Sequence, residues 1–352
     1  MTSGQLALLL KQKARQLGFT LAGIALPIHP AHLDVYLNWL NAGRQAGMAY
    51  LAEPRAVERR ADPTQILPEC RSILVLGTPY ANPQSMQPEE DPLPRGRVAV
   101  YAWGADYHLV LPERLQALVA FLEEQVGHAI PNRWYTDTGP ILERELAMRA
   151  GLGWIGKNTC LINPRLGSTF LLSEILLGLE LPPDEPFRAD HCGTCTRCID
   201  ACPTHCIRAD RTLEAGRCIS YLTIENKVEI PPELRPLMGE WIFGCDICQM
   251  TCPWNQRFAS SQGDPAFDPR SGMPAPALAE ELALSPQKFN QKFKNSPLQR
   301  AKRRGYLRNI ATACGNSGKI ELLTALEAAQ NDPEPLVREA IRWAVGHIKG
   351  DW

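Results

Sequence analysis

Four closely spaced cysteines are the most chemically informative residues of this 352-residue chain. They read C-x2-C-x2-C-x3-C, with a proline directly after them, and are Cys192, Cys195, Cys198 and Cys202. The two-residue gaps allow one tight loop to direct three thiolates at a single cubane, while the fourth cysteine, stiffened by Pro203, points to a second cluster. The spacing therefore predicts a [4Fe–4S] site of the bacterial ferredoxin type.

An incomplete copy of this run follows further along the chain. It reads C-x2-C-x3-C, again with a proline after it, and consists of Cys245, Cys248 and Cys252. The first cysteine of a full run is missing from its usual place. Cys218 can replace it across an insertion, with Cys206 as the competing residue. We favour Cys218 because Cys206 is crowded against Cys202.

The two runs are expected to exchange their fourth ligands, as two-cluster ferredoxins do. Cluster one is then held by Cys192, Cys195, Cys198 and Cys252, and cluster two by Cys202, Cys218, Cys245 and Cys248. Paired C-x2-C motifs also hold structural zinc, but two C-x3-C-P endings favour iron and sulfide. Two clusters form an electron path, and that path must end at an acceptor elsewhere in the protein.

The stretch before the cysteines alternates strand and helix patterns, and it must supply that acceptor. We expect strands at 72–77, 98–101 and 133–137, helices at the N-terminus, 112–125 and 141–150, and a strand or helix at 170–177. This alternation is typical of an α/β architecture.

Composition divides the chain into four parts. Proline and acidic residues gather at 181–191, and Ser, Gly, Pro and Asp at 260–276, as in linkers. We expect an α/β domain at 1–180, a two-cluster ferredoxin-type module at 181–260, a linker at 261–285 and a helical segment at 286–352. Residues 332–346 resemble the second helix of a HEAT-type repeat.

Bulk composition is that of an ordinary globular chain. Hydrophobic residues make up 45% and charged residues 21%, and the formal net charge of −1 identifies no partner. No apolar run approaches the length that spans a bilayer, and the N-terminus lacks the pattern of a secretory signal. We expect a cytoplasmic monomer without membrane association, because no sustained heptad pattern is present.

A basic run lies between Glu281 and Glu321, where no acidic residue occurs. We expect tRNA contacts from seven of its cations, which are Lys288, Lys292, Arg300, Lys302, Arg303, Arg304 and Arg308. Three aromatic residues, Phe289, Phe293 and Tyr306, interleave with them. A local positive stripe in a neutral chain is typical of phosphate-backbone binding, although a solvated basic helix face has the same pattern.

Several stretches outside the first cysteine run resemble the epoxyqueuosine reductases, cobalamin-dependent enzymes of tRNA modification. The matching stretches are YAWGADYH at 101–108, DTGP at 137–140, RELA at 144–147, GLGWIGKNT at 151–159 and GCDICQ at 244–249. The resemblance covers nearly the whole chain and implies cobalamin in a nitroreductase-like α/β domain, reduced through the two clusters by an external electron donor. The implied reaction converts epoxyqueuosine in a tRNA anticodon to queuosine.

Asp137 matches the proton donor of these enzymes. A carboxyl group beside a large corrin would be desolvated, which raises its pKa and keeps a proton available. An ordinary turn or helix-cap aspartate is the alternative. The resemblance also places Asp106, Tyr107 and His108 on the substrate side, although His108 also fits an ordinary residue at a helix start. It places Arg60 and Tyr101 in the cofactor pocket, and Asn158 either at the corrin amides or at the cap of the following strand. Asp246 and Ile247 lie between two ligands of cluster two and must approach the corrin if that cluster faces it.

Two other functions fit parts of the pattern. A corrinoid reductive dehalogenase shares the cofactor layout, but such enzymes are usually exported and have no evident need for a basic helical segment. A non-catalytic electron-transfer subunit needs the clusters but not Asp137. An assay on tRNA that carries epoxyqueuosine separates these functions.

Overall fold

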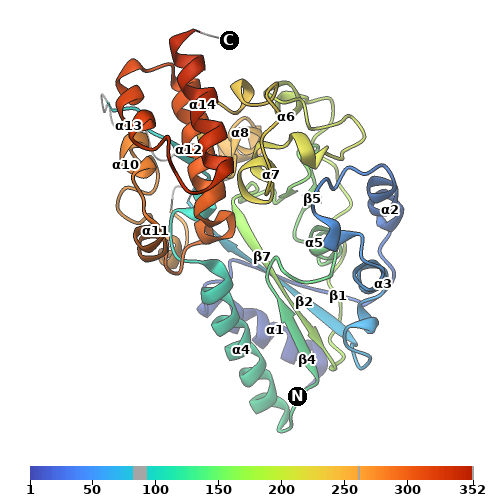
Figure 1. The fold of residues 1–352 in the computed structure, drawn as a ribbon. Coiled ribbons are helices and arrows are strands. Elements are labelled where there is room, and N and C mark those ends of the chain that lie inside the picture. The colour runs from blue at the N-terminus through green and yellow to red at the C-terminus, as the bar shows by residue number, and fades with distance from the viewer. Residues whose placement is uncertain (82–92, 261, 351–352) are drawn as a thin grey trace.

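The computed structural model describes residues 1–81, 93–260 and 262–350 (Figure 1). At its centre is a four-stranded sheet with the order β1 (Leu21–Ala25), β2 (Ser72–Pro79), β7 (Phe170–Leu177) and β4 (Asn132–Tyr135). Every neighbouring pair is antiparallel. The alternation of strands and helices in the sequence thus predicted a mixed α/β layer correctly but carried no information on strand direction.

The two faces of the sheet bury different cores because side chains alternate along a strand. Leu74 and Leu76 face the core formed with α1 (Ser3–Gln16) and α4 (Tyr107–Val126). Ile73 and Val75 face the opposite core, which includes α5 (Glu143–Arg149). The helix α5 lies so close to β1 that a Cβ atom on Gly23 would meet the Ala150 carbonyl oxygen at 2.1 Å.

Helix α4 begins five residues earlier than the sequence pattern predicted. The Asp106 carboxylate accepts a hydrogen bond from the His108 backbone N–H and caps the helix, which then continues through Pro112. The predicted strand at 98–101 is also shorter, since only β3 (Arg97–Val98) is extended and a 3₁₀ turn follows. The apolar stretch at 170–177, predicted as strand or helix, is strand β7.

The cysteine module contains short elements joined by loops. They are α6 (Arg197–Asp200), α7 (Ile219–Ile224), β8 (Trp241–Phe243), α8 (Ile247–Met250) and α9 (Pro253–Phe258). Strand β8 pairs in parallel with β3 and so ties the module to the first part of the chain. Four further elements of the first part lie near the module or the sheet, namely α2 (Leu33–Asn41), α3 (Pro54–Ala61), β5 (Trp154–Ile155) and β6 (Leu161–Ile162).

The C-terminal part is helical, as the sequence predicted. It comprises α10 (Leu278–Leu282), α11 (Pro286–Lys292), α12 (Lys302–Ser317), α13 (Leu323–Ala328) and α14 (Pro335–Lys349). Helices α12 and α14 lie side by side in Figure 1 and pack closely against each other. Their buried side chains continue the core of α1 and α4. Among the described residues, no helix is long and apolar enough to cross a membrane.

Candidate active site and cluster cavities

The four cysteines predicted for cluster one line a single cavity of about 170 Å³. Three come from the loop before and within α6, and Cys252 is the N-cap residue of α9. Lys157, Asn158 and Trp254 complete the wall. The structure thus brings together thiols that are far apart in sequence, as the exchange of fourth ligands predicted.

Three side chains from the β5–β6 hairpin direct nitrogen atoms at the cluster-one loop. Trp154 Nε1 donates to Cys192 Sγ at 3.4 Å, and Lys157 Nζ donates to the Gly193 and Cys195 carbonyl oxygens at 2.7 and 3.0 Å. Asn158 is only 4% exposed, and its Nδ2 has no hydrogen-bond partner among the described residues. A buried donor without a partner needs an acceptor, and an anionic iron–sulfur cluster would provide one.

The second group of cysteines gathers on the inner side of the module. Cys202, Cys206 and Ile207 form a small buried cluster against which Cys218 and Cys248 pack. The Cys202 and Cys206 sulfur atoms are 3.4 Å apart, so the crowding that the sequence indicated is present. Cys206 also contacts Cys218. The choice of Cys218 as the fourth ligand therefore stays a prediction.

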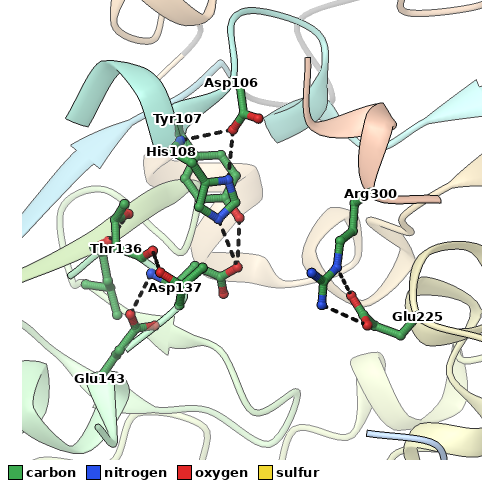
Figure 2. Close-up of polar contacts among 10 residues, drawn as sticks. Asp106, Tyr107, His108, Thr136, Asp137, Glu143, Glu225 and Arg300 are labelled. Atoms are coloured by element: carbon green, nitrogen blue, oxygen red, sulfur yellow. Dashed lines mark hydrogen bonds and ion pairs between the residues drawn. The ribbon is translucent and has the colours of Figure 1, made fainter. Parts of the chain in front are cut away.

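Asp137 follows β4 and lies opposite the first turn of α4 (Figure 2). Its Oδ2 accepts a hydrogen bond from the Tyr107 hydroxyl at 3.0 Å and lies 3.5 Å from His108 Nε2. The other ring nitrogen of His108 is 2.8 Å from the Asp106 carboxylate. The cap that starts α4 thus also orients His108 toward Asp137.

The protonation of this corner differs from the sequence-based expectation. Desolvation by the surrounding protein raises the pKa of Asp137, but hydrogen bonds from His108 and Tyr107 outweigh that effect and lower the pKa below its usual value. Burial lowers the pKa of His108, yet the Asp106 and Asp137 carboxylates raise it to about 9. These hydrogen bonds oppose the increase in the pKa of Asp137 that is expected beside a corrin, and in this arrangement at neutral pH the proton lies on His108.

A cavity of about 540 Å³ opens beside Asp137. Its wall is largely apolar and includes Val35, Trp39, Ile141 and Met148. Arg60 also lines it, with its guanidinium 5.6 Å from the Tyr36 ring. Nine charged side chains also line the cavity, among them Arg60, Asp137 and Glu143. A mainly apolar wall with such polar groups fits a large organic cofactor that carries polar substituents.

The remaining residues predicted near a cofactor lie in two other places. Asn158 is at the cluster-one cavity. Tyr101 packs 6.1 Å from Tyr107, and it is close enough to both Asp137 and Asp246 for their charges to raise its pKa, although burial raises it most. Asp246 accepts a hydrogen bond from the Val100 backbone N–H at 2.8 Å, and Ile247 packs into the same core as Tyr101. Tyr101 and Asp246 thus connect the cluster-two ligands with the Asp137 corner.

The basic segment differs most from its prediction. Arg308 is 1% exposed, and its guanidinium donates to the carbonyl oxygens of Asn226, Val228 and Leu222. Its prediction as an RNA contact is wrong, because the side chain fills a structural role inside the protein. The three interleaved aromatic rings of this segment are also buried and pack on one another, so they offer no surface for base stacking.

Other cations of this segment form ion pairs. Lys292 pairs with Glu281, Arg303 with Asp332, and Arg300 with Glu225, the last shown in Figure 2. Lys288, Lys302 and Arg304 are exposed and have no carboxylate partner among the described residues. The prediction of RNA contact therefore now rests mainly on these three side chains and on Arg300.

Sequence reasoning missed two carboxylic acids beside Asp137. Glu143, at the start of α5, accepts a hydrogen bond from the Asp137 backbone N–H at 2.8 Å. Glu174, on β7, is fully buried behind it. The sequence signal was a glutamate within a mostly apolar strand, which is unusual because buried carboxylic acids are rare.

Comparisons with known proteins agree with this layout. Residues 191–255 match a family described as a 4Fe-4S double cluster binding domain, and residues 60–138 match the family described as Epoxyqueuosine reductase QueG, DUF1730. An epoxyqueuosine reductase from Pseudomonas aeruginosa is 40% identical over 346 residues, which span 97% of this chain and 94% of the relative.

Solved structures give the same result. The crystal structure of an epoxyqueuosine reductase with an epoxyqueuosine-modified tRNA-Tyr stem loop has a TM-score of 0.88 and 31% identity, covering 98% of this chain and 90% of that one. A Bacillus subtilis epoxyqueuosine reductase, whose catalytic aspartate loop is described as swung out of the active site, has a TM-score of 0.87 and 31% identity over the same shares. The chain described here belongs to the epoxyqueuosine reductase family.

Proposed function

We propose that this protein reduces the epoxide of epoxyqueuosine in a tRNA anticodon to the alkene of queuosine. The observation that carries the proposal is the placement of Asp137, with two hydrogen-bond donors, at the mouth of a large apolar cavity in a chain with two groups of cysteines. Converting an epoxide to an alkene consumes two electrons and two protons and releases water. The site must therefore supply an electron path and a proton donor.

The cysteine groups provide the electron path. Cluster one would occupy the cavity lined by Lys157 and Asn158, and cluster two the inner group next to Asp246. Tyr101 lies close to both Asp246 and Asp137, so cluster two is the one nearer the reaction. Electrons from an external donor would enter at cluster one and leave through cluster two.

The large cavity fits the corrin cofactor of this family. Cobalamin, when bound, supplies the low-valent cobalt that reduces the substrate ring. Arg60 and Asp137 line the cavity, whereas Tyr101, Asp246 and Ile247 lie outside its wall, between the cluster-two cysteines and the Asp137 corner. Asn158 fits cluster one better than it fits the corrin.

Asp137 and His108 together hold the proton for the departing oxygen. Tyr107 and His108 both approach Oδ2 of Asp137, so this is the oxygen that would receive the proton from His108. When cofactor and substrate displace water, desolvation raises the pKa of Asp137, and the proton passes from His108 through Asp137. Because the pKa of His108 is about 9, the rate should fall as the pH rises through that value.

The substrate RNA would lie against the exposed cations of the C-terminal part. Lys288, Lys302 and Arg304 are free to neutralise phosphates, and Arg300 lies across the site from Asp137 in Figure 2. An unstacked anticodon base can be turned into a cavity, as enzymes that modify bases require. We expect the protein to act as a cytoplasmic monomer.

The test is conversion of a synthetic anticodon stem loop that carries epoxyqueuosine. Protein is loaded anaerobically with iron, sulfide and cobalamin, reduced chemically, and the nucleoside is analysed by mass spectrometry. We expect loss of one oxygen atom, and no conversion when cobalamin is omitted. Fully loaded and reduced protein that leaves the epoxide intact would contradict the proposal.

The two alternative functions are not favoured. Identity of 40% to a reductase over 97% of the chain is difficult to reconcile with a dehalogenase. An electron-transfer subunit would not need the contacts that orient His108 toward Asp137.

A further inference from the structure

Asp137 is held in a backbone conformation that residues other than glycine rarely adopt. Its φ is +60°, in the left-handed region. Thr138 N–H donates to the Thr136 carbonyl oxygen at 2.6 Å across the turn. Such conformations persist only where the surroundings enforce them, and they are concentrated at functional sites. The backbone of Asp137 is held by the hydrogen bond from its N–H to Glu143 Oε1, at 2.8 Å (Figure 2).

Glu174 lies behind Glu143 and has an unusual environment. It sits opposite Tyr135 in the register of β7 and β4, directly before the Asp137 turn. The Glu174 side chain is 0% exposed. When Glu143 and Glu174 are both ionised, neither oxygen of Glu174 has a hydrogen-bond donor among the described residues. A buried carboxylate without a cation or donor is very costly, so such a group takes up a proton instead.

The charged groups around the two acids support a neutral Glu174. Burial, and then the charge of Glu143, raise the pKa of Glu174 well above its usual value. Burial, and then the charge of Asp137, raise the pKa of Glu143 to about 7, while Arg144 acts in the opposite direction. The proton shared by the pair therefore belongs to Glu174, and Glu143 remains an acceptor.

We propose that Glu174, as a neutral carboxylic acid, donates a hydrogen bond to Glu143, and that Glu143 in turn is the positioning residue that holds Asp137 in its working orientation. The kinetic effects expected from this arrangement rest on the proposed function, whereas the structural effects do not. Strand β7 thereby fixes the catalytic turn through two side chains. A relative whose aspartate loop is swung out of the active site shows that such a loop can leave its place.

Four substitutions test the arrangement. Glu174→Gln replaces the neutral acid by a neutral donor of the same shape, whereas Glu174→Leu removes the donor. Glu143→Gln keeps an acceptor for the Asp137 N–H, whereas Glu143→Ala removes it. Glu327→Gln, at an exposed carboxylate paired with Lys349, controls for an acid-to-amide change elsewhere.

The first readout needs no turnover. Hydrogen exchange of the peptide that contains 136–142 is measured in cluster-loaded protein without RNA. We expect faster exchange in Glu174→Leu and Glu143→Ala, and exchange close to that of the parent protein in the two glutamine variants and in Glu327→Gln. Unchanged exchange in Glu143→Ala, or exchange in Glu174→Gln as fast as in Glu174→Leu, would overturn the proposal.

The second readout is kinetic. We expect Glu143→Ala to lower kcat by about tenfold or more, as for loss of a hydrogen bond to a charged group, with little change in KM. Glu174→Gln should recover most of the kcat that Glu174→Leu loses. A change in KM alone would contradict a positioning role. If the parent protein does not reduce epoxyqueuosine, the proposed function fails, while the exchange experiment still decides this inference.

Discussion

The cysteine module and the basic C-terminal segment each concentrate one type of chemically active side chain, and they use it differently. In the module, four thiols line a cavity, and beside them Asn158 Nδ2 has no partner among the described residues. In the segment, Arg308 is saturated by backbone carbonyl oxygens, and Lys292 and Arg303 pair with carboxylates.

This difference shows that the density of a residue type is a weaker sign of function than its lack of an internal partner. Folded proteins satisfy nearly all of their buried polar groups. Groups that the fold directs at a cavity without satisfying them are therefore the ones available to a ligand. The Asp137 corner is intermediate, since Oδ2 is held by two donors while the side chain still reaches the cavity.

The largest expected effect comes from removing a thiol of the cluster-one cavity. Cys198→Ala should abolish that cluster and all turnover, because no other cysteine lines this cavity besides the four predicted ligands. Iron and sulfide content, with the visible absorbance of anaerobic protein, measure the loss. Cys70→Ala is the matched control, since Cys70 is packed in the core below the sheet.

Cys206→Ala sharpens the assignment of cluster two. If Cys218 is the fourth ligand, this variant keeps both clusters and Cys218→Ala does not. The reverse pattern of iron content would transfer the ligand role to Cys206.

Arg308→Met should produce the next largest effect, on stability. The substitution removes hydrogen bonds to three carbonyl oxygens, of which those of Asn226 and Leu222 are in buried contacts, and this should cost about 2–5 kcal/mol of unfolding free energy. Thermal unfolding of cluster-loaded protein measures the change, with Arg304→Met as the exposed control. A melting temperature equal to that of Arg304→Met would show that the Arg308 hydrogen bonds do not stabilise the fold.

The exposed cations should have a smaller, salt-dependent effect on RNA affinity. Reversing Lys302 and Arg304 to Glu should weaken stem-loop binding and reduce the salt dependence of log Kobs by about one unit for each lost phosphate contact. Lys319→Glu, at a residue after the end of α12, is the matched comparison for Lys302→Glu alone, because the two single reversals change the net charge equally. Equal affinity and an equal salt slope in the parent protein and the double variant would exclude this surface.

Lys157→Met should have the smallest effect, on the potential of cluster one alone. The ammonium group lies at the cavity wall and favours the more negative, reduced cluster. Its removal should lower the midpoint potential by tens of millivolts, on the order of 1 kcal/mol for a one-electron couple. A redox titration followed by electron paramagnetic resonance measures this change in potential. A change in the midpoint potential of cluster two instead would show that Lys157 lies next to that cluster.

A feature could be predicted from the sequence when the residues that determine it lie close together in the chain. Cysteine spacing acts within one loop, and the apolar run at 72–77 is a buried strand wherever it packs. Burial of Arg308 and Glu174 depends on segments more than 30 residues away or on another layer, so no local pattern reports it. The low pKa of Asp137 likewise arises from His108, whose position depends on where α4 begins.

The most direct test of the account is a single-turnover experiment on Asp137→Asn. The variant, loaded with both clusters and cobalamin, is reduced and mixed with the epoxyqueuosine stem loop. We predict clusters and cobalamin that reduce as in the parent protein and RNA binding of equal affinity, but loss of conversion to queuosine. Conversion at the parent rate would contradict the central claim that Asp137 delivers the proton on which the reduction depends.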